Sequence, residues 1–285
     1  MSMKFTKNTS DFFVPDSSPM PRAAGRVTHL CVGAHQDDIE IMAFHGVKTC
    51  FGQADKWFGG VVVTDGGGSP RTGKFASMTD GDMKRVRLEE QREAARIGQY
   101  AFVAQLGYPS AEVKDRENKN VAADLKKIFE ASGAEVVYLH QPFDKHETHI
   151  ATLGHCLRAL VELPEERRPK LVLGCEVWRD LDWLDDTRKV PLDVGGMDEL
   201  ASRLLCVFES QVAGGKRYDL GAMGRRAANA TFAQSHGVDK AEGVTFAIEL
   251  TDLVRGKEVG SVKEFVEKAL GELAADVRRK TEKHL

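Results

Sequence analysis

Residues 26–40 read RVTHLCVGAHQDDIE, and this stretch indicates both the fold and the chemistry of the chain. Residues 26–33 form a short apolar run typical of a buried β-strand, and apolar side chains recur at helical spacing over residues 39–51. A second apolar run, GGVVVT at 59–64, completes a strand, helix and strand. Because parallel strands need a crossover long enough to hold a helix, this unit predicts a parallel sheet.

The alternation of strands and helices continues through most of the chain. Residues 65–81 are rich in Gly, Ser and Thr and predict a loop, which a charged helix at 82–97 follows. Five apolar strands separated by helices favour an α/β, Rossmann-like fold, with a mostly parallel sheet and helices on both faces. The remaining predicted elements are strands at 101–106, 135–140 and 170–177 and helices at 121–132 and 149–163.

The last third of the chain has a less regular pattern, and no linker separates it from the rest. We therefore expect an extended N-terminal lead at 1–25 and a single domain at 26–285. Within that domain we expect a catalytic core at 26–190 and a C-terminal α/β elaboration at 191–285. The elements predicted in this last part are helices at 197–211, 218–235 and 261–283 and a strand at 243–250.

Composition excludes several classes of protein. The 285 residues contain 40 Lys and Arg against 43 Asp and Glu, and no block of clustered basic residues, which argues against nucleic-acid binding. No run of about 18 apolar residues predicts a membrane span, and the N-terminus has no signal-peptide pattern. The five cysteines are scattered without a C-x-x-C pair, which favours a reducing cytoplasm. The net charge of −3 favours a small, largely uncharged substrate.

The residues that follow the first predicted strand have the types that bind metal. Reactive groups gather at the carboxyl ends of parallel strands, and here the sequence is Ala34-His35-Gln36-Asp37-Asp38. The imidazole of His35 and the carboxylate of Asp38 suit a zinc-type ion and share one side of the turn. Asp37 then points elsewhere and is a candidate general base. The alternative is that Asp37 or Asp38 caps the helix that begins near residue 39.

The fourth strand is followed by two histidines, His146 and His149, spaced three residues apart at the start of a helix. A parallel sheet would bring them beside the end of the first strand, where they supply a third ligand, a nitrogen atom. A zinc ion with three protein ligands keeps an open position for water and lowers the pKa of that water to about 7. The joint pattern predicts a hydrolase.

Two loops are candidates for the walls of this site. The run Gly66-Gly67-Gly68-Ser69 lacks the phosphate-binding P-loop pattern, so we expect it to pass close to the metal pocket. Trp178 and Trp183 follow the fifth strand and could form a wall on which a sugar stacks. The alternative for this last segment is a partly buried loop with solvated charges.

At these residues the chain resembles the PIG-L or LmbE-like family of zinc-dependent de-N-acetylases. The family signature A-H-P-D-D-x-E is matched at 34–40, except that Gln36 replaces the proline. The second signature, H-x-D-H, is matched at 146–149 with Thr148 in place of the aspartate, and Asp144 is a nearby substitute. Weaker matches are the glycine-rich stretch at 63–67, the R-x-x-E helix at 87–90 and an S-Q element at 210–211, and the likeness covers residues 26 to about 163 well.

The resemblance implies a zinc-dependent hydrolase that removes an N-acetyl group from an amino-sugar conjugate of N-acetylglucosamine type, with metal-bound water as the nucleophile. It also makes a homo-oligomer plausible. The alternatives are an amidase acting on another amide, such as a thiol conjugate, and a metal-retaining binding module without activity. The implied roles are His35, Asp38 and His149 as ligands of zinc or a similar divalent metal, Asp37 as general base, His146 as stabiliser of the oxyanion, and Arg87 as a substrate contact. The missing aspartate beside His149 would remove an orienting partner from His146.

Overall fold

The computed structural model describes residues 3–255 and 261–285, and its strands form one mixed sheet. The strand order is β1-β4-β3-β2-β5-β6-β8-β7, in which β4, β3, β2, β5 and β6 run parallel. The sheet is antiparallel at both edges: β1 pairs antiparallel with β4, and β8 pairs antiparallel with both β6 and β7. The predicted α/β fold is confirmed. The strands are β1 (Asp11–Phe13), β2 (His29–Gly33), β3 (Phe58–Thr64), β4 (Phe102–Tyr108), β5 (Val136–His140), β6 (Leu171–Cys175), β7 (Lys189–Asp193) and β8 (Val244–Glu249).

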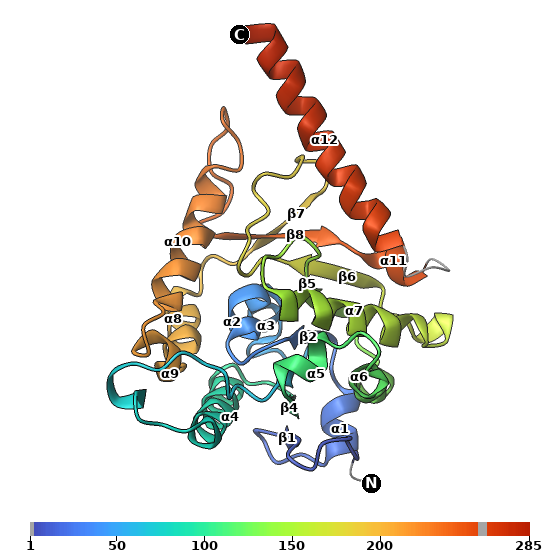
Figure 1. The fold of residues 1–285 in the computed structure, drawn as a ribbon, viewed down its shortest axis with the longest axis vertical. Helices are drawn as coiled ribbons and strands as arrows, with labels where there is room; N and C mark the ends of the chain where they lie inside the picture. The colour runs from blue at the N-terminus through green and yellow to red at the C-terminus, as the bar shows by residue number, and fades with distance from the viewer. Residues whose placement is uncertain (1–2, 256–260) are drawn as a thin grey trace.

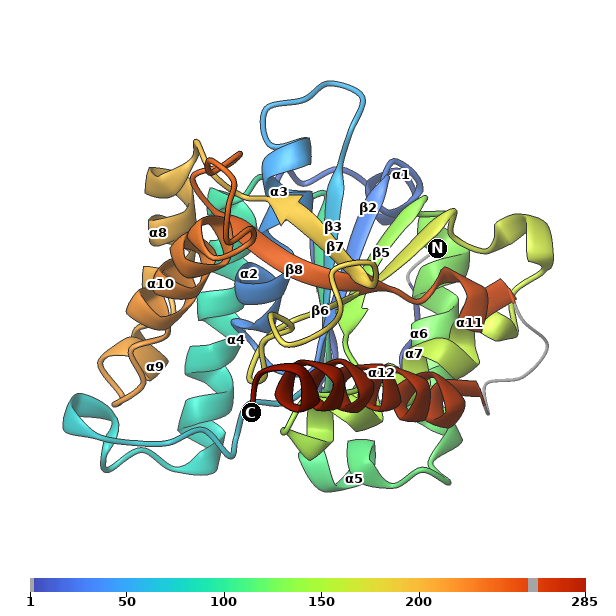
Figure 2. The same ribbon diagram turned by 90° about the horizontal axis from the view of Figure 1, so that it is seen from above.

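Helices cover both faces of the sheet (Figures 1 and 2). The α-helices are α1 (Met20–Gly25), α2 (Asp38–Met42), α3 (Phe44–Cys50), α4 (Asp80–Ile97), α5 (Ser110–Lys114), α6 (Lys119–Ser132), α7 (Glu147–Val161), α8 (Asp198–Cys206), α9 (Glu209–Val212), α10 (Tyr218–Thr231), α11 (Thr251–Arg255) and α12 (Ser261–His284). Two short 3-10 helices are η1 (Gly73–Phe75) and η2 (Glu165–Arg167). Among the described residues, no helix has the length and apolar character needed to cross a membrane.

Two hydrophobic cores lie on opposite faces of the sheet because successive side chains of a strand point in opposite directions. In β2, Leu30 and Val32 join the core under α6 and α7, whereas Cys31 joins the core under α2, α3 and α4. In β3, every residue is buried, as expected for a central parallel strand covered on both faces. This arrangement leaves the carboxyl ends of the strands as the place where polar side chains meet.

The structure corrects the sequence-based elements at several points. The single helix predicted at 39–51 is two helices, α2 and α3, with a break at Ala43, and the helix predicted at 197–211 is likewise divided into α8 and α9. The short edge strands β1 and β7 and the short helices α1, α5 and α11 were not predicted. These elements are three to six residues long, too short for a periodic pattern to develop.

The break between α2 and α3 is stabilised by Arg226, which reaches it from α10. The buried Arg226 side chain donates from Nη2 to the carbonyl oxygens of Glu40 at 2.8 Å and Ile41 at 3.2 Å. Its guanidinium also lies 4.7 Å from the centre of the Phe44 ring. Burial lowers the pKa of Arg226 to about 10, which still leaves it charged at neutral pH. The last third of the chain therefore supports the helix that begins with Asp38.

We expect Arg226→Met to lower the free energy of unfolding by about 3 kcal/mol, because two buried carbonyl oxygens lose their donor. Urea unfolding followed by circular dichroism measures this change. Arg203→Met, on the exposed side of α8, is the matched control and should change stability by less than about 0.5 kcal/mol. Equal stabilities of the two variants would show that Arg226 does not hold the break.

Candidate active site

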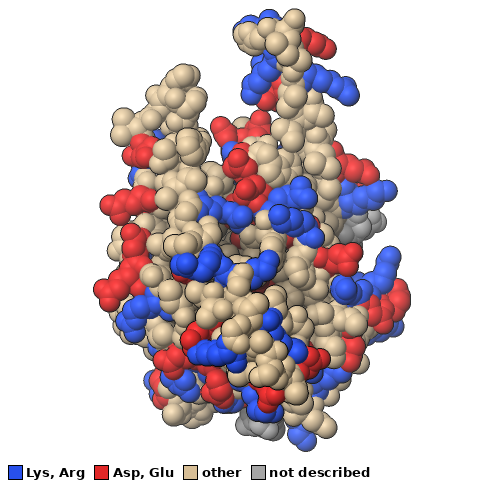
Figure 3. Space-filling model, turned by 60° about the vertical axis from the view of Figure 1, so that its left-hand side comes forward, with Lys and Arg blue, Asp and Glu red and all other residues tan. Residues whose placement is uncertain are grey.

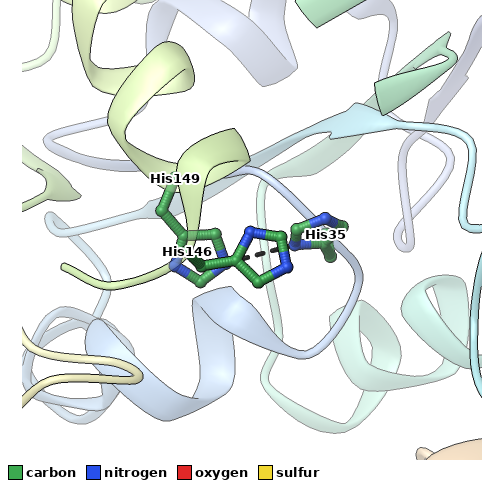
Figure 4. Close-up of side chains that lie close together, drawn as sticks. All are labelled: His35, His146 and His149. Carbon is green, nitrogen blue, oxygen red and sulfur yellow. Dashed lines mark hydrogen bonds between the residues drawn. The ribbon is translucent and has the colours of Figure 1, made fainter. Parts of the chain in front are cut away.

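The sequence-predicted site residues meet at the carboxyl ends of β2 and β5, which pair in parallel. His35, Asp37 and Asp38 follow β2 directly, while His146 and His149 lie at the start of α7 just after β5. Figure 4 shows the rings of His35, His146 and His149 close together at this edge. Asp38 can pack closely against the end of β2 because residue 33 is glycine. A Cβ at residue 33 would lie only 2.9 Å from the Cβ of Asp38.

Three donor atoms form a nearly equilateral triangle. His35 Nδ1 lies 3.2 Å from His149 Nε2 and 3.3 Å from Asp38 Oδ2, and the third side, from His149 Nε2 to Asp38 Oδ2, is 3.4 Å. Tetrahedral zinc with bonds of about 2.0–2.1 Å places its ligand atoms about 3.3 Å apart. The donor types and their spacing therefore fit a divalent ion of the zinc kind.

The protonation states of these groups also suit a metal. Burial lowers the pKa of His149 to about 4, so its imidazole is neutral at physiological pH. Burial tends to raise the pKa of Asp38, but the neighbouring imidazoles of His149 and His140 hold it well below the usual range. A neutral imidazole and an ionised carboxylate are the forms that bind metal ions.

His140, the last residue of β5, lies behind this triangle and was not assigned a role from the sequence. Its Nε2 is 3.4 Å from Asp38 Oδ2, and the ring stacks on His149 with centroids 3.9 Å apart. That same Nε2 accepts a 2.8 Å hydrogen bond from the backbone N–H of Ala34, which occupies its lone pair. His140 therefore supports the triangle by packing, and its position at a strand end was the only signal in the sequence.

Asp37 lies beside the triangle in a left-handed backbone conformation with φ of 80°. This conformation is costly for a residue other than glycine, and the Asp37 N–H is held by a 3.3 Å hydrogen bond to Gln91 Oε1. Asp37 occupies the N-cap position of α2 but makes no capping side-chain hydrogen bond, and Asp38 accepts its hydrogen bond from the His35 N–H. The capping alternative for Asp37 is therefore wrong.

The carboxylate of Asp37 is not free, as the sequence led us to expect, but pairs with Arg87. Both terminal nitrogens of Arg87 lie 3.3 Å from Asp37 Oδ2, and Nη2 also donates to the Gln36 carbonyl at 2.5 Å. Burial raises the pKa of Asp37 to about 7, and the guanidinium of Arg87 opposes that rise. Arg87 is only 2% exposed and is thus no surface residue of α4.

A pocket of about 760 Å³ opens above these groups, within the range of small-molecule sites. Gly66 lines it with a positive φ of 71°, and a Cβ at this position would meet Gln36 Oε1 at 2.6 Å. Trp178 also lines the pocket, but Trp183 packs edge-on against Phe143 at 5.2 Å and is not among its lining residues. The glycine-rich loop thus passes close to the site, whereas only one of the two tryptophans borders it.

The model of the PIG-L family, described as GlcNAc-PI de-N-acetylase, matches residues 30–175, more than half of the chain. The chain belongs to this family. No curated protein matches it. The solved structures described next are less than 20% identical to this chain, so their likeness establishes the PIG-L fold alone.

Three solved structures resemble this PIG-L chain. A conserved protein from Thermus thermophilus is 17% identical with a TM-score of 0.58, covering 79% of this chain and 94% of that one. The N,N'-diacetylchitobiose deacetylase of Pyrococcus horikoshii is 19% identical with a TM-score of 0.56, covering 81% and 88%. The 4-carboxy-2-hydroxymuconate hydratase of Pseudomonas putida is 15% identical with a TM-score of 0.58, covering 79% and 96%.

Gln36 is the first departure of this PIG-L chain from the family signature. Its side chain is buried, and Nε2 donates to Gln105 Oε1 at 3.1 Å and to the Thr64 carbonyl at 3.4 Å. These bonds tie the turn after β2 to β3 and β4. The replacement of proline is therefore accommodated by a polar contact across the sheet, and the carbonyl of Gln36 is still available to Arg87.

Thr148 is the second departure from the PIG-L pattern, and Asp144 does not take over the role that the resemblance suggested. Asp144 Oδ2 lies 3.1 Å from His149 Nδ1, whereas Oδ1 accepts from the backbone N–H of His146 and not from its ring. Among the described residues, the buried Nδ1 of His146 has no hydrogen-bond partner. Asp144 thus orients a proposed metal ligand, and the ring of His146 is held by stacking on His149 at 4.6 Å instead.

We expect Asp144→Asn to weaken metal affinity about tenfold or more, because carboxylate partners orient ligating histidines and raise their basicity. Competition with a chromophoric chelator measures the affinity. Asp182→Asn, an exposed position in the loop after β6, should leave the affinity unchanged. If Asp144→Asn binds metal as tightly as the wild type, the carboxylate does not support His149.

Proposed function

We propose that this chain is a metal-dependent N-deacetylase that hydrolyses the acetamide of an amino sugar of N-acetylglucosamine type or of its conjugate. The observation that carries the proposal is the triangle of His35, Asp38 and His149 with the carboxylate of Asp37 beside it, at the floor of a pocket. Three ligands leave coordination positions for water and substrate, which is typical of a catalytic site. Membership of the PIG-L family supports the same chemistry.

A divalent ion held by His35, Asp38 and His149 would polarise the acetyl carbonyl and lower the pKa of water. Asp37 is the group that takes the proton of the attacking water and passes it toward the amine. Its pairing with Arg87 favours the ionised form that a base requires, although the carboxylate is buried. Arg87 also lines the pocket, where it can contact the substrate.

His146 borders the same pocket as Asp37 and is suited to donate a hydrogen bond to the developing oxyanion. Burial lowers the pKa of His146, so the ring is neutral at physiological pH and carries one N–H. Its ring lies edge-on to His35 at 4.8 Å and stacks on His149, which fixes its plane. A donor aimed at the place where charge develops stabilises the transition state more than the ground state.

The test measures acetate release from a panel of N-acetylated sugars and sugar conjugates, with the metal content determined on the same sample. We expect release that disappears on chelation and returns when zinc or a similar ion is added. Release of an acid other than acetate from a wider amide panel would instead identify an amidase. Metal-loaded protein that hydrolyses no amide would contradict the proposal and would favour the alternative of a metal-retaining binding module without activity.

A further inference from the structure

The pocket has an excess of positive charge that the proposed reaction does not use. In Figure 3, Lys and Arg side chains form a band across the middle of one face, with acidic side chains above and below it. The only carboxylates that line the pocket among the described residues are Asp37 and Asp38, and both are engaged at its floor. Lys114, Lys216 and Arg225 also line it. The overall charge of −3 therefore does not describe the lining of this pocket.

Lys216 is positioned close to the reacting end of the pocket by Trp178. Its Nζ lies 5.1 Å from the centre of the Trp178 ring, and that ring is 6.2 Å from the ring of His146. Tyr218 holds the indole from another side, edge-on at 6.0 Å. The ammonium group and the ring of His146 are therefore both neighbours of the same indole ring. A small substrate whose amide lies beside His146 could reach Lys216 with one of its substituents.

Arg225 and Lys114 extend this positive wall from two other helices. Arg225 lies on α10, is half-buried and donates to the carbonyl of Val177, next to Trp178. Neither Arg225 nor Lys216 has a carboxylate oxygen within 4 Å among residues 3–255 and 261–285, although Glu176 and Asp180 attract Arg225 from a greater distance. Lys114, at the end of α5, has only a 3.6 Å contact with the exposed Glu147. Lys216 is thus a half-buried cation without a carboxylate within 4 Å among the described residues, a costly arrangement that an anionic ligand would relieve.

We propose that Lys216 and Arg225, with Lys114 at the rim, form a subsite for a negatively charged substituent of the substrate, a phosphate ester or a carboxylate. This inference rests on the proposed deacetylase function and names its substrate class as an anionic N-acetylated amino sugar. Charge-assisted hydrogen bonds to such a group stabilise a complex enough to change affinity about 10–100-fold. The indole of Trp178 packs against the apolar face of the sugar between the two ends.

The experiment compares kcat/KM for acetate release from N-acetylglucosamine, its 1-phosphate and 6-phosphate, and the carboxylate-bearing N-acetylmuramic acid. We expect at least one anionic sugar to exceed the neutral sugar about tenfold or more. That advantage should shrink as salt rises from about 0.05 to 0.5 M, because salt screens the attraction. The phosphate and carboxylate sugars separate the two chemical sources of charge. Equal values for neutral and anionic sugars would overturn the proposal.

Two variants show whether Lys216 provides the preference. Lys216→Met keeps the contact with Trp178 but removes the charge, and should lower the ratio of anionic to neutral kcat/KM about tenfold, while Lys216→Arg should restore it. Lys283→Gln removes the same charge at the exposed end of α12 and should leave the ratio unchanged. Equal losses on both substrates in Lys216→Met would indicate a structural role and contradict the subsite.

A binding measurement separates failure of this inference from failure of the proposed function. In phosphate-free buffer, glucosamine 6-phosphate should raise the unfolding temperature more than glucosamine does, and Lys216→Met should remove that difference. If no sugar is hydrolysed but this difference is found, the anion subsite stands without the deacetylase. If acetate is released but charge affects neither binding nor rate, the deacetylase stands and the subsite is rejected.

Discussion

Asp37→Asn is expected to lower kcat for acetate release about 10³-fold while the metal stays bound. The carboxylate lines the pocket together with His35 and Asp38 and is the proposed general base, and removing a general base costs about 10²–10⁴-fold in rate. The amide of asparagine has the same shape but no basicity. Steady-state kinetics and metal analysis by mass spectrometry on one sample measure both quantities. Glu93→Gln, on the exposed side of α4, makes the same chemical change outside the site.

The pairing of Asp37 with Arg87 complicates this variant, because Asp37→Asn leaves a buried guanidinium without its carboxylate. A second variant, Asp37→Asn with Arg87→Met, removes both charges together. If the single variant unfolds, the double variant restores charge balance and should still lack activity. Activity within tenfold of the wild type in either variant would place the base elsewhere. Loss of the metal from a folded Asp37→Asn protein would make Asp37 a ligand.

His149→Ala is expected to remove both the metal and the activity, because only two donors of the triangle remain. Asp38→Ala should have the same effect. A site with two ligands loses several orders of magnitude in affinity, so the purified variant should hold less than about a tenth of the wild-type metal. Elemental analysis after gel filtration measures the content, and acetate release should fall to background.

His155→Gln is the matched control for His149→Ala. His155 lies on the same helix, is also buried, and contacts the carbonyl of Val113 at 2.8 Å, outside the triangle. This variant should keep its metal even if its stability decreases. Stoichiometric metal in folded His149→Ala would show that the ion is held by a different set of residues.

The proposed ligand triangle was predictable because each of its two halves follows the end of a strand. His35 and Asp38 are three residues apart at one strand end, and the parallel sheet places His149 beside them. The contacts that could not be predicted join residues far apart in the sequence. Arg87 meets Asp37 across 50 positions, and Arg226 meets Glu40 across 186. Helical periodicity at 39–51 contains no sign of the break that Arg226 supports.

The role of Asp144 shows a second limit of sequence reasoning. Its proximity to His146 in the sequence suggested that it replaces the aspartate missing at Thr148, but the turn before α7 directs the carboxylate toward His149. Spacing in a loop does not determine side-chain direction, which depends on the backbone of each residue. The pocket cations were missed for a similar reason, since Lys114, Lys216 and Arg225 come from separate segments.

The position of β8 in the sequence has a consequence for how the chain folds while it is being synthesised. The region matched by the family model ends with β6, whose outer edge pairs with β8, and β8 begins only at Val244. A nascent chain emerges from the ribosome N-terminus first, so the apolar edge of β6 stays uncovered while about 70 further residues are translated. During that interval the edge is open to pairing with other chains. Fragments designed around residues 30–175 alone would keep it open permanently and would need a substitute strand to stay in solution.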